Sequence, residues 1–114
     1  MSERIVTPVQ VEARQRALGA ELDEATGAVA ESESAYLGAK TDYEIAFARA
    51  IIRAEGPNAA IREAQATLIT ENELRALRAT EATWRALKAN VDRVRVQVDI
   101  ARSVGTIVKS SMTV

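Results

Sequence analysis

The sequence predicts an all-α protein, a long antiparallel helical hairpin of the coiled-coil type that assembles into a multi-helix bundle. Three observations support this fold. Apolar side chains recur every three or four residues along most of the 114 residues, one Gly-Pro turn interrupts them near the middle, and the chain has only four aromatic residues. Many of the apolar residues are alanine, which favours helix but buries little area. We therefore expect a thin core and association with further helices.

The first helix is expected at about residues 8–55. Thr7 is a capping residue, Pro8 suits the first helical position, and Gln10 completes a capping box. The seam that follows includes small residues at alternate positions, so a second helix can approach closely on that side. It consists of Val11, Leu18, Leu22, Ala25, Val29, Ser32, Tyr36, Ala39, Tyr43 and Ala46.

Residues 55–58 are expected to form the turn of the hairpin. Gly56 is able to adopt a positive φ after a helix, Pro57 prevents the helix from continuing, and Asn58 is a capping residue for the next one. The second helix is expected at about residues 59–109, with a break near residues 69–73, where polar residues interrupt the apolar pattern. The whole chain is interpreted as a single helical unit.

An apolar stripe along the second helix predicts the surface through which chains associate. The three-four spacing from Trp84 to Met112 forms a narrow seam, and a second apolar line widens this face toward the C-terminal end. Residues 94–100 also alternate like a strand, but the longer stripe favours helix there. The predicted oligomer interface comprises Trp84, Leu87, Val91, Val94, Val98, Ile100, Val104, Ile107 and Val108.

The composition argues against an enzyme, a metal site or a bound cofactor. The chain has no cysteine and no histidine, which removes thiolate ligands, the usual zinc ligand and the commonest general base. Neighbouring carboxylates such as Asp23 and Glu24 fall on the outer face of a helix, where no pocket for a small-molecule substrate is predicted. No apolar run approaches the ~18 residues of a membrane span, and Met1–Thr7 lack the apolar stretch of a secretory signal. A cytoplasmic protein is expected.

Charge is unevenly distributed between the two predicted helices. Residues 1–60 carry a net charge of −4 and residues 61–114 a net charge of +3. The cations of the second helix are candidate nucleic-acid contacts, although interleaved acids favour a ladder of ion pairs such as Glu81–Arg85, Asp92–Arg95 and Asp99–Arg102. The candidate contacts are Arg78, Arg85, Lys88, Arg95 and Arg102, with Arg75 and Arg93 beside them.

Several short segments resemble small helical proteins of tailed bacteriophages that have no assigned function and are often encoded among DNA-replication and recombination genes. The similar segments are Tyr36, Tyr43 and Ala46-Phe47-Ala48; Ala54-Glu55-Gly56; Arg62 with Ala64; Glu81-Ala82-Thr83-Trp84-Arg85; and Asp99-Ile100-Ala101-Arg102-Ser103. The resemblance covers about residues 20–112 and brings no catalytic or binding residues with it.

These observations lead to three hypotheses about function. The first is a non-enzymatic, homo-oligomeric accessory or adaptor protein of the phage type, which acts by contact with a protein partner near DNA metabolism in the cytoplasm of a bacterial host. The second is a direct nucleic-acid-binding accessory protein that uses the basic second helix. The third is a structural component of a virion or scaffold.

Overall fold

The computed structural model describes residues 6–112, and these residues form three α-helices and no strand. Helix α1 spans Pro8–Arg53, α2 spans Ala59–Ile69 and α3 spans Glu71–Met112. The prediction of an all-α helical hairpin is confirmed. Residues 94–100, which alternate like a strand in the sequence, are helical and belong to α3. Of the segment Met1–Thr7, in which no secretory signal is expected, residues 1–5 lie outside the described residues.

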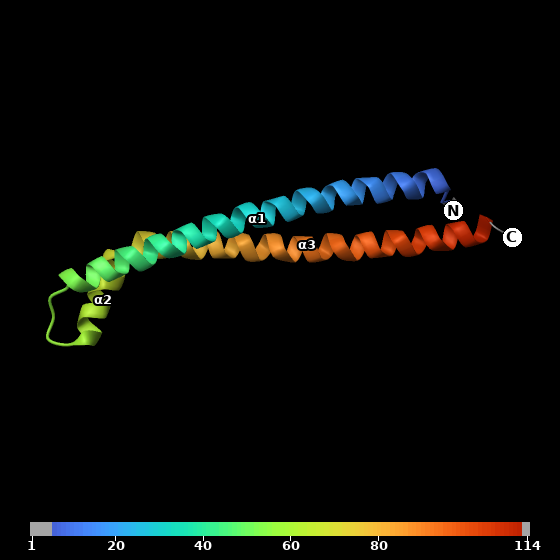
Figure 1. Ribbon diagram of the computed structural model, residues 1–114. Helices are drawn as coiled ribbons and strands as arrows, with labels where there is room; N and C mark the ends of the chain where they lie inside the picture. The colour runs from blue at the N-terminus through green and yellow to red at the C-terminus, as the bar shows by residue number, and fades with distance from the viewer. Residues whose placement is uncertain (1–5, 113–114) are drawn as a thin grey trace, which may run out of the picture. The chain divides into compact units, whose positions relative to one another are not determined.

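The chain divides into two compact units. Unit 1 consists of Met1–Val29 with Leu87–Val114, so it combines the first half of α1 with the second half of α3. Unit 2 is the continuous segment Ala30–Ala86, which holds the rest of α1, the whole of α2 and the start of α3. Within unit 1 the start of α1 and the end of α3 lie at the same end, so the two helices are antiparallel (Figure 1).

A capping box begins α1. The backbone N–H of Thr7 donates to Oε1 of Gln10 at 3.0 Å, and the backbone N–H of Gln10 donates to Oγ1 of Thr7 at 3.2 Å. Each residue thereby satisfies a donor that the first turn of a helix leaves without an intrahelical acceptor. The start of α1 is therefore determined by neighbouring residues alone.

Residues 54–58 connect α1 to α2. Oδ1 of Asn58 accepts a 3.0 Å hydrogen bond from the backbone N–H of Ile61, as an N-cap should. Gly56 does not adopt the positive φ anticipated for it, since no glycine among residues 6–112 has a positive φ. Its small size matters instead, because a Cβ atom at position 56 would lie 2.9 Å from Cγ2 of Ile61. Nη1 of Arg62 donates to the carbonyl oxygen of Gly56 at 3.1 Å and links the loop to α2.

Thr70 separates α2 from α3, within the region 69–73 where the sequence predicts a break. Its side chain is only 2% exposed, and its hydroxyl donates to the carbonyl oxygen of Ala66 at 2.7 Å. The Thr70 backbone N–H donates to the same carbonyl oxygen at 3.0 Å, while its own carbonyl oxygen accepts from Leu74. Thr70 thus ends α2 and supports the first turn of α3.

The core of each unit is narrow. In unit 2 the rings of Tyr36 on α1 and Trp84 on α3 are stacked, with centroids 5.0 Å apart and an angle of 12° between their planes. The ring of Tyr43 contacts that of Phe47 one turn further along α1. Residues buried in unit 2 are small or polar, namely Ser32, Ala50, Ala66 and Thr70.

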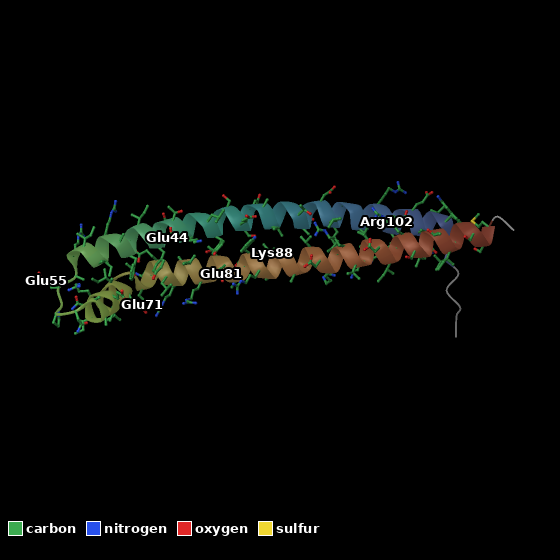
Figure 2. The ribbon with its side chains drawn as sticks, turned by 60° about the horizontal axis from the view of Figure 1, so that its bottom comes forward. Glu44, Glu55, Glu71, Glu81, Lys88 and Arg102 are labelled. Atoms are coloured by element: carbon green, nitrogen blue, oxygen red, sulfur yellow. The ribbon has the colours of Figure 1, made fainter. Side chains whose placement is uncertain are left out.

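Helix α2 turns its larger apolar side chains to the outside of unit 2. Ile61, Leu68 and Ile69 are exposed, whereas Ala66 is fully buried. Charged side chains project from unit 2 (Figure 2). Of those labelled, Glu44, Glu71 and Glu81 lie on helices, and Glu55 lies in the loop between α1 and α2. The sequence pattern predicts the helical state of α2 but does not distinguish which side of it is covered.

Candidate interaction surface

The seam between α1 and α3 in unit 1 follows the predicted apolar stripe. Leu18 and Val94 are essentially fully buried, and the side chains around them are buried as well. The buried residues of this seam are Val11, Leu18, Ala25, Val91, Val94, Ala101 and Gly105. Nε2 of Gln15 enters the seam and donates to the carbonyl oxygen of Ala101 at 3.4 Å. Small residues at positions 101 and 105 allow the two helices to approach each other here.

An apolar groove runs along one side of this seam. It has a volume of about 710 Å³ and is open to solvent along the helices. Side chains of α1 and of Val6, two residues before it, form one wall, and side chains of α3 form the other. The lining residues are Val6, Gln10, Val11, Arg14, Leu18, Gln97, Ile100, Ala101 and Val104.

Four large aliphatic residues of α3 form an exposed line along and beyond this groove. Val96 is 57% exposed, Ile100 58%, Val104 37% and Ile107 68%. The spacing of these four residues places them on one stripe of the helix, which we call the apolar line. A helix pair that buries a single seam leaves such a line uncovered. Contiguous apolar surface of this kind marks an interaction site more often than isolated exposed residues do.

The structure separates the predicted oligomer interface into a covered and an uncovered part. Val91 and Val94 are buried within the chain, while Trp84, Leu87, Val98 and Val108 are partly buried. These six residues belong to the seam between α1 and α3 rather than to the open surface. The exposed part is Ile100, Val104 and Ile107, the second apolar line that the sequence places beside the seam.

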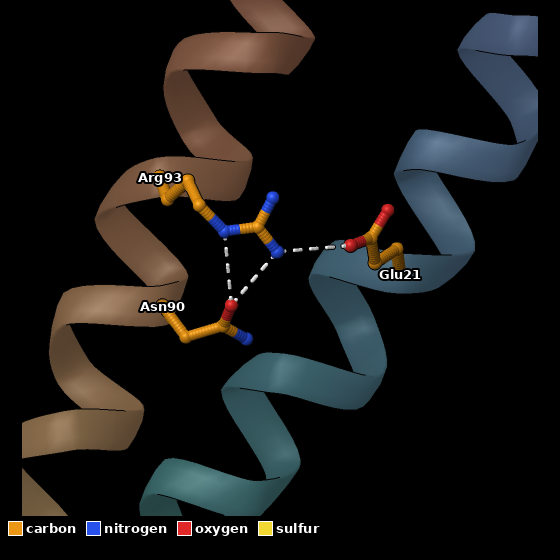
Figure 3. Close-up of polar contacts among 3 residues, drawn as sticks. All are labelled: Glu21, Asn90 and Arg93. Carbon is orange, nitrogen blue, oxygen red and sulfur yellow. Dashed lines mark hydrogen bonds and ion pairs between the residues drawn. The ribbon is translucent and has the colours of Figure 1, made fainter.

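A polar bridge crosses the seam next to the groove. Nη2 of Arg93 on α3 lies 3.4 Å from Oε1 of Glu21 on α1 (Figure 3). Oδ1 of Asn90 accepts hydrogen bonds from Nε and Nη2 of the same guanidinium at 3.2 and 2.9 Å. Arg93 stands one helical turn before Gln97, so the bridge continues the groove side of the helix pair. The polar bridge therefore bounds the apolar surface at the end of the groove nearest Arg93.

The opposite side of the seam is polar and carries most of the basic residues of unit 1. Lys88, Arg95, Arg102 and Lys109 recur every seven residues and occupy one stripe of α3, which we call the basic flank. Arg102 and Lys109 line a shallow hollow with Glu12 and Gln15 of α1. Lys88 and Arg102 are both labelled on α3 in Figure 2. The two sides of unit 1 therefore differ in chemistry.

The candidate nucleic-acid contacts are all exposed, but they do not form one open basic surface. Arg85 pairs with Glu81 at 2.6 Å in unit 2, and Arg95 approaches Asp92 at 3.8 Å in unit 1. Arg75, beside them in the sequence, pairs with Glu71. Within residues 6–112, no ion pair joins Asp99 to Arg102, although their spacing allows one. Two of the three predicted ladder pairs are thus formed.

The described residues hold no cluster of three acidic, histidine or cysteine side chains that could bind a metal ion. Among the described residues, no helical segment stays apolar over the length that a membrane span requires. The larger openings of unit 1 lie along its two sides and are lined by helix surface.

The α1 wall of the groove is the part of the site that sequence reasoning missed. Gln10 and Arg14 line the groove, yet neither belongs to the predicted interface. A signal existed in their spacing, since Gln10, Arg14 and Glu21 follow one stripe of α1 beside the seam residues Val11 and Leu18. Because these three residues are polar, the apolar three-four pattern does not include them.

No protein-family model, curated protein or solved structure shows significant similarity to this chain.

Proposed function

We propose that the protein is a non-enzymatic accessory or adaptor protein of the tailed-phage type, which acts by protein–protein contact near DNA metabolism in the cytoplasm of a bacterial host. The observation that supports this role best is the apolar line beside an open groove in unit 1. Burial of a large aliphatic side chain stabilises a complex by about 1.5–3 kcal/mol, so four of them on one stripe favour a specific contact. The phage context rests on the sequence resemblance.

A pull-down from the native host tests this role. The full chain carries the affinity tag, and Ile100→Glu is compared with Ile52→Glu, an aliphatic residue of unit 2 that is 83% exposed. We expect a captured protein to be lost with Ile100→Glu, since a carboxylate in the contact would be buried without a partner. The same protein should be retained with Ile52→Glu. Equal capture by both variants would contradict a role for this surface.

Direct binding of nucleic acid is the second candidate, favoured by the seven-residue spacing of the basic flank. Titration of single- and double-stranded DNA in a gel-shift assay, at low and high salt, decides between the two roles. Phosphate contacts release counterions, so true binding weakens steeply as salt rises. Arg95→Ala combined with Arg102→Ala should reduce that salt dependence if the basic flank makes the contacts. Absence of binding at low salt would exclude this candidate.

A further inference from the structure

We propose that the apolar groove of unit 1 binds a second copy of this chain, with α1 of each copy lying on α3 of the other. The two copies are related by a two-fold axis that runs along the helices, so that each helix is antiparallel to both of its neighbours. This inference rests on the proposed function in one respect: it takes the protein partner at this surface to be a second copy of the same chain.

Charge complementarity favours this pairing. Among the described residues of unit 1, the α1 segment carries four acidic and two basic side chains, and the α3 segment carries two acidic and five basic ones. A bundle in which α1 and α3 alternate puts each helix between two helices of opposite net charge. The other two-fold pairing brings α1 against α1 and α3 against α3, and thus like charges together. Such juxtaposition is unfavourable and selects against that pairing.

The shape of the surface also suits a second copy. A two-fold interface uses the same patch on both partners, so the patch must contain both a depression and a ridge. Unit 1 has both on one side: the groove lies between the helices, and the side chains of Ile100 and Ile107 stand along α3 beside it. Each copy can therefore insert part of its apolar line into the groove of the other.

The surface area that a stable dimer must bury requires both α1 and α3 in the interface. A stable interface buries about 800 Å² on each partner, which is more than four aliphatic side chains of one helix supply. The α1 wall adds Gln10 and Arg14. The aliphatic stem of Arg14 can cover apolar surface while its guanidinium stays in water at the edge. A pairing that used α3 alone would leave this wall uncovered.

The mass of the full chain in solution is the first test, measured by size-exclusion chromatography with light scattering. The wild-type chain should show about twice the 12.3 kDa of one chain. Ile100→Glu should weaken the dimer at least about tenfold and return the mass to that of a single chain. The control Ile52→Glu should remain dimeric, and circular dichroism should show unchanged helix content in both variants. A wild-type chain that is monomeric at every concentration would overturn the proposal.

Cysteine cross-linking tests which helices pair. The natural chain has no cysteine, so a single introduced thiol is unique. Ala17→Cys places it on α1 and Gln97→Cys on α3, both at exposed or half-buried positions of the groove side. An equal mixture of the two variants, oxidised after exchange, should yield mainly the mixed disulfide. Disulfides that form mainly within each single variant would show like-with-like pairing and overturn the arrangement.

These results separate this inference from the adaptor role. A monomeric chain whose host partner is lost with Ile100→Glu would overturn the second copy and leave the adaptor role standing. A dimer with mixed disulfides that captures no host protein would support the second copy and contradict the adaptor role.

Discussion

The side-chain amide of Gln15 on α1 lies directly over Gly105 on α3. A Cβ atom at position 105 would stand 2.8 Å from Nε2 of Gln15 and 3.2 Å from Cγ1 of Val11. The same Nε2 donates to the carbonyl oxygen of Ala101, one turn earlier on α3. The absence of a side chain at Gly105 therefore makes room for a polar group within an otherwise apolar seam. This contact is specific to the register in which α1 and α3 pack in unit 1.

Replacing Gly105 should reveal this close contact when it is compared with an open glycine of the same unit. Gly27 has no heavy atom within 4 Å of an added Cβ, so Gly27→Ala should raise the free energy of unfolding by about 1 kcal/mol through helix propensity. Gly105→Ala gains the same propensity but displaces Gln15 and crowds Val11. The effect of Gly105→Ala should be less favourable by about 1 kcal/mol, chiefly through Val11, because the Gln15 amide ends a flexible side chain and can move aside. Urea unfolding at one protein concentration measures both, and equal stabilisation would contradict the contact.

The stacked rings of Tyr36 and Trp84 provide a local probe of unit 2. Trp84 is the only tryptophan of the chain, so its fluorescence reports on this contact. Tyr36→Ala should lower the free energy of unfolding by about 2 kcal/mol and shift the emission to longer wavelength, because water reaches the indole face. Tyr43→Ala removes a ring that contacts Phe47 instead, and should leave the emission maximum unchanged. A similar shift in both variants would argue against a specific stack.

The ion pair between Glu21 and Arg93 should contribute little to stability. Both side chains are about half exposed, and Nη2 and Oε1 are 3.4 Å apart. Exposed pairs typically contribute less than about 1 kcal/mol, because water and salt screen them. Glu21→Gln should therefore change the free energy of unfolding by less than about 0.5 kcal/mol, and by less again in high salt. A loss of several times this size in chemical denaturation would show that the bridge organises unit 1.

The N-cap at Asn58 should contribute more to the free energy of unfolding than the ion pair between Glu21 and Arg93. Asn58→Ala removes the acceptor for the backbone N–H of Ile61, at the start of an 11-residue helix. We expect the free energy of unfolding to fall by about 1 kcal/mol, whereas Asn58→Asp should retain most of the stability. Thermal unfolding followed by circular dichroism compares the three proteins. Equal melting temperatures for Asn58→Ala and the wild type would contradict the role of this cap.

The helices, their approximate ends and the seam of unit 1 follow from the sequence. The helix caps join residues that are three apart in the chain, namely Thr7 with Gln10 and Asn58 with Ile61. They can therefore be predicted without knowledge of the fold. The seam is also predictable, because residues spaced three or four apart lie on one face of a helix. Leu18, Val94 and Ala101 are buried members of such patterns. The exposed line of Ile100, Val104 and Ile107 was likewise predictable, because it lies beside a seam that one neighbouring helix already fills.

The way in which the two walls of the groove meet depends on the packing of α1 against α3. Gln10 and Arg14 face Ile100 and Val104 only because α1 and α3 pack at one particular register. That register depends on contacts between residues far apart in the chain, such as Gln15 with Gly105, and no local pattern specifies them. The same reason explains Gly56, whose small size is needed for Ile61 rather than for an unusual backbone conformation. Local chemistry thus determines the helices, and side-chain packing between them determines the surface they present.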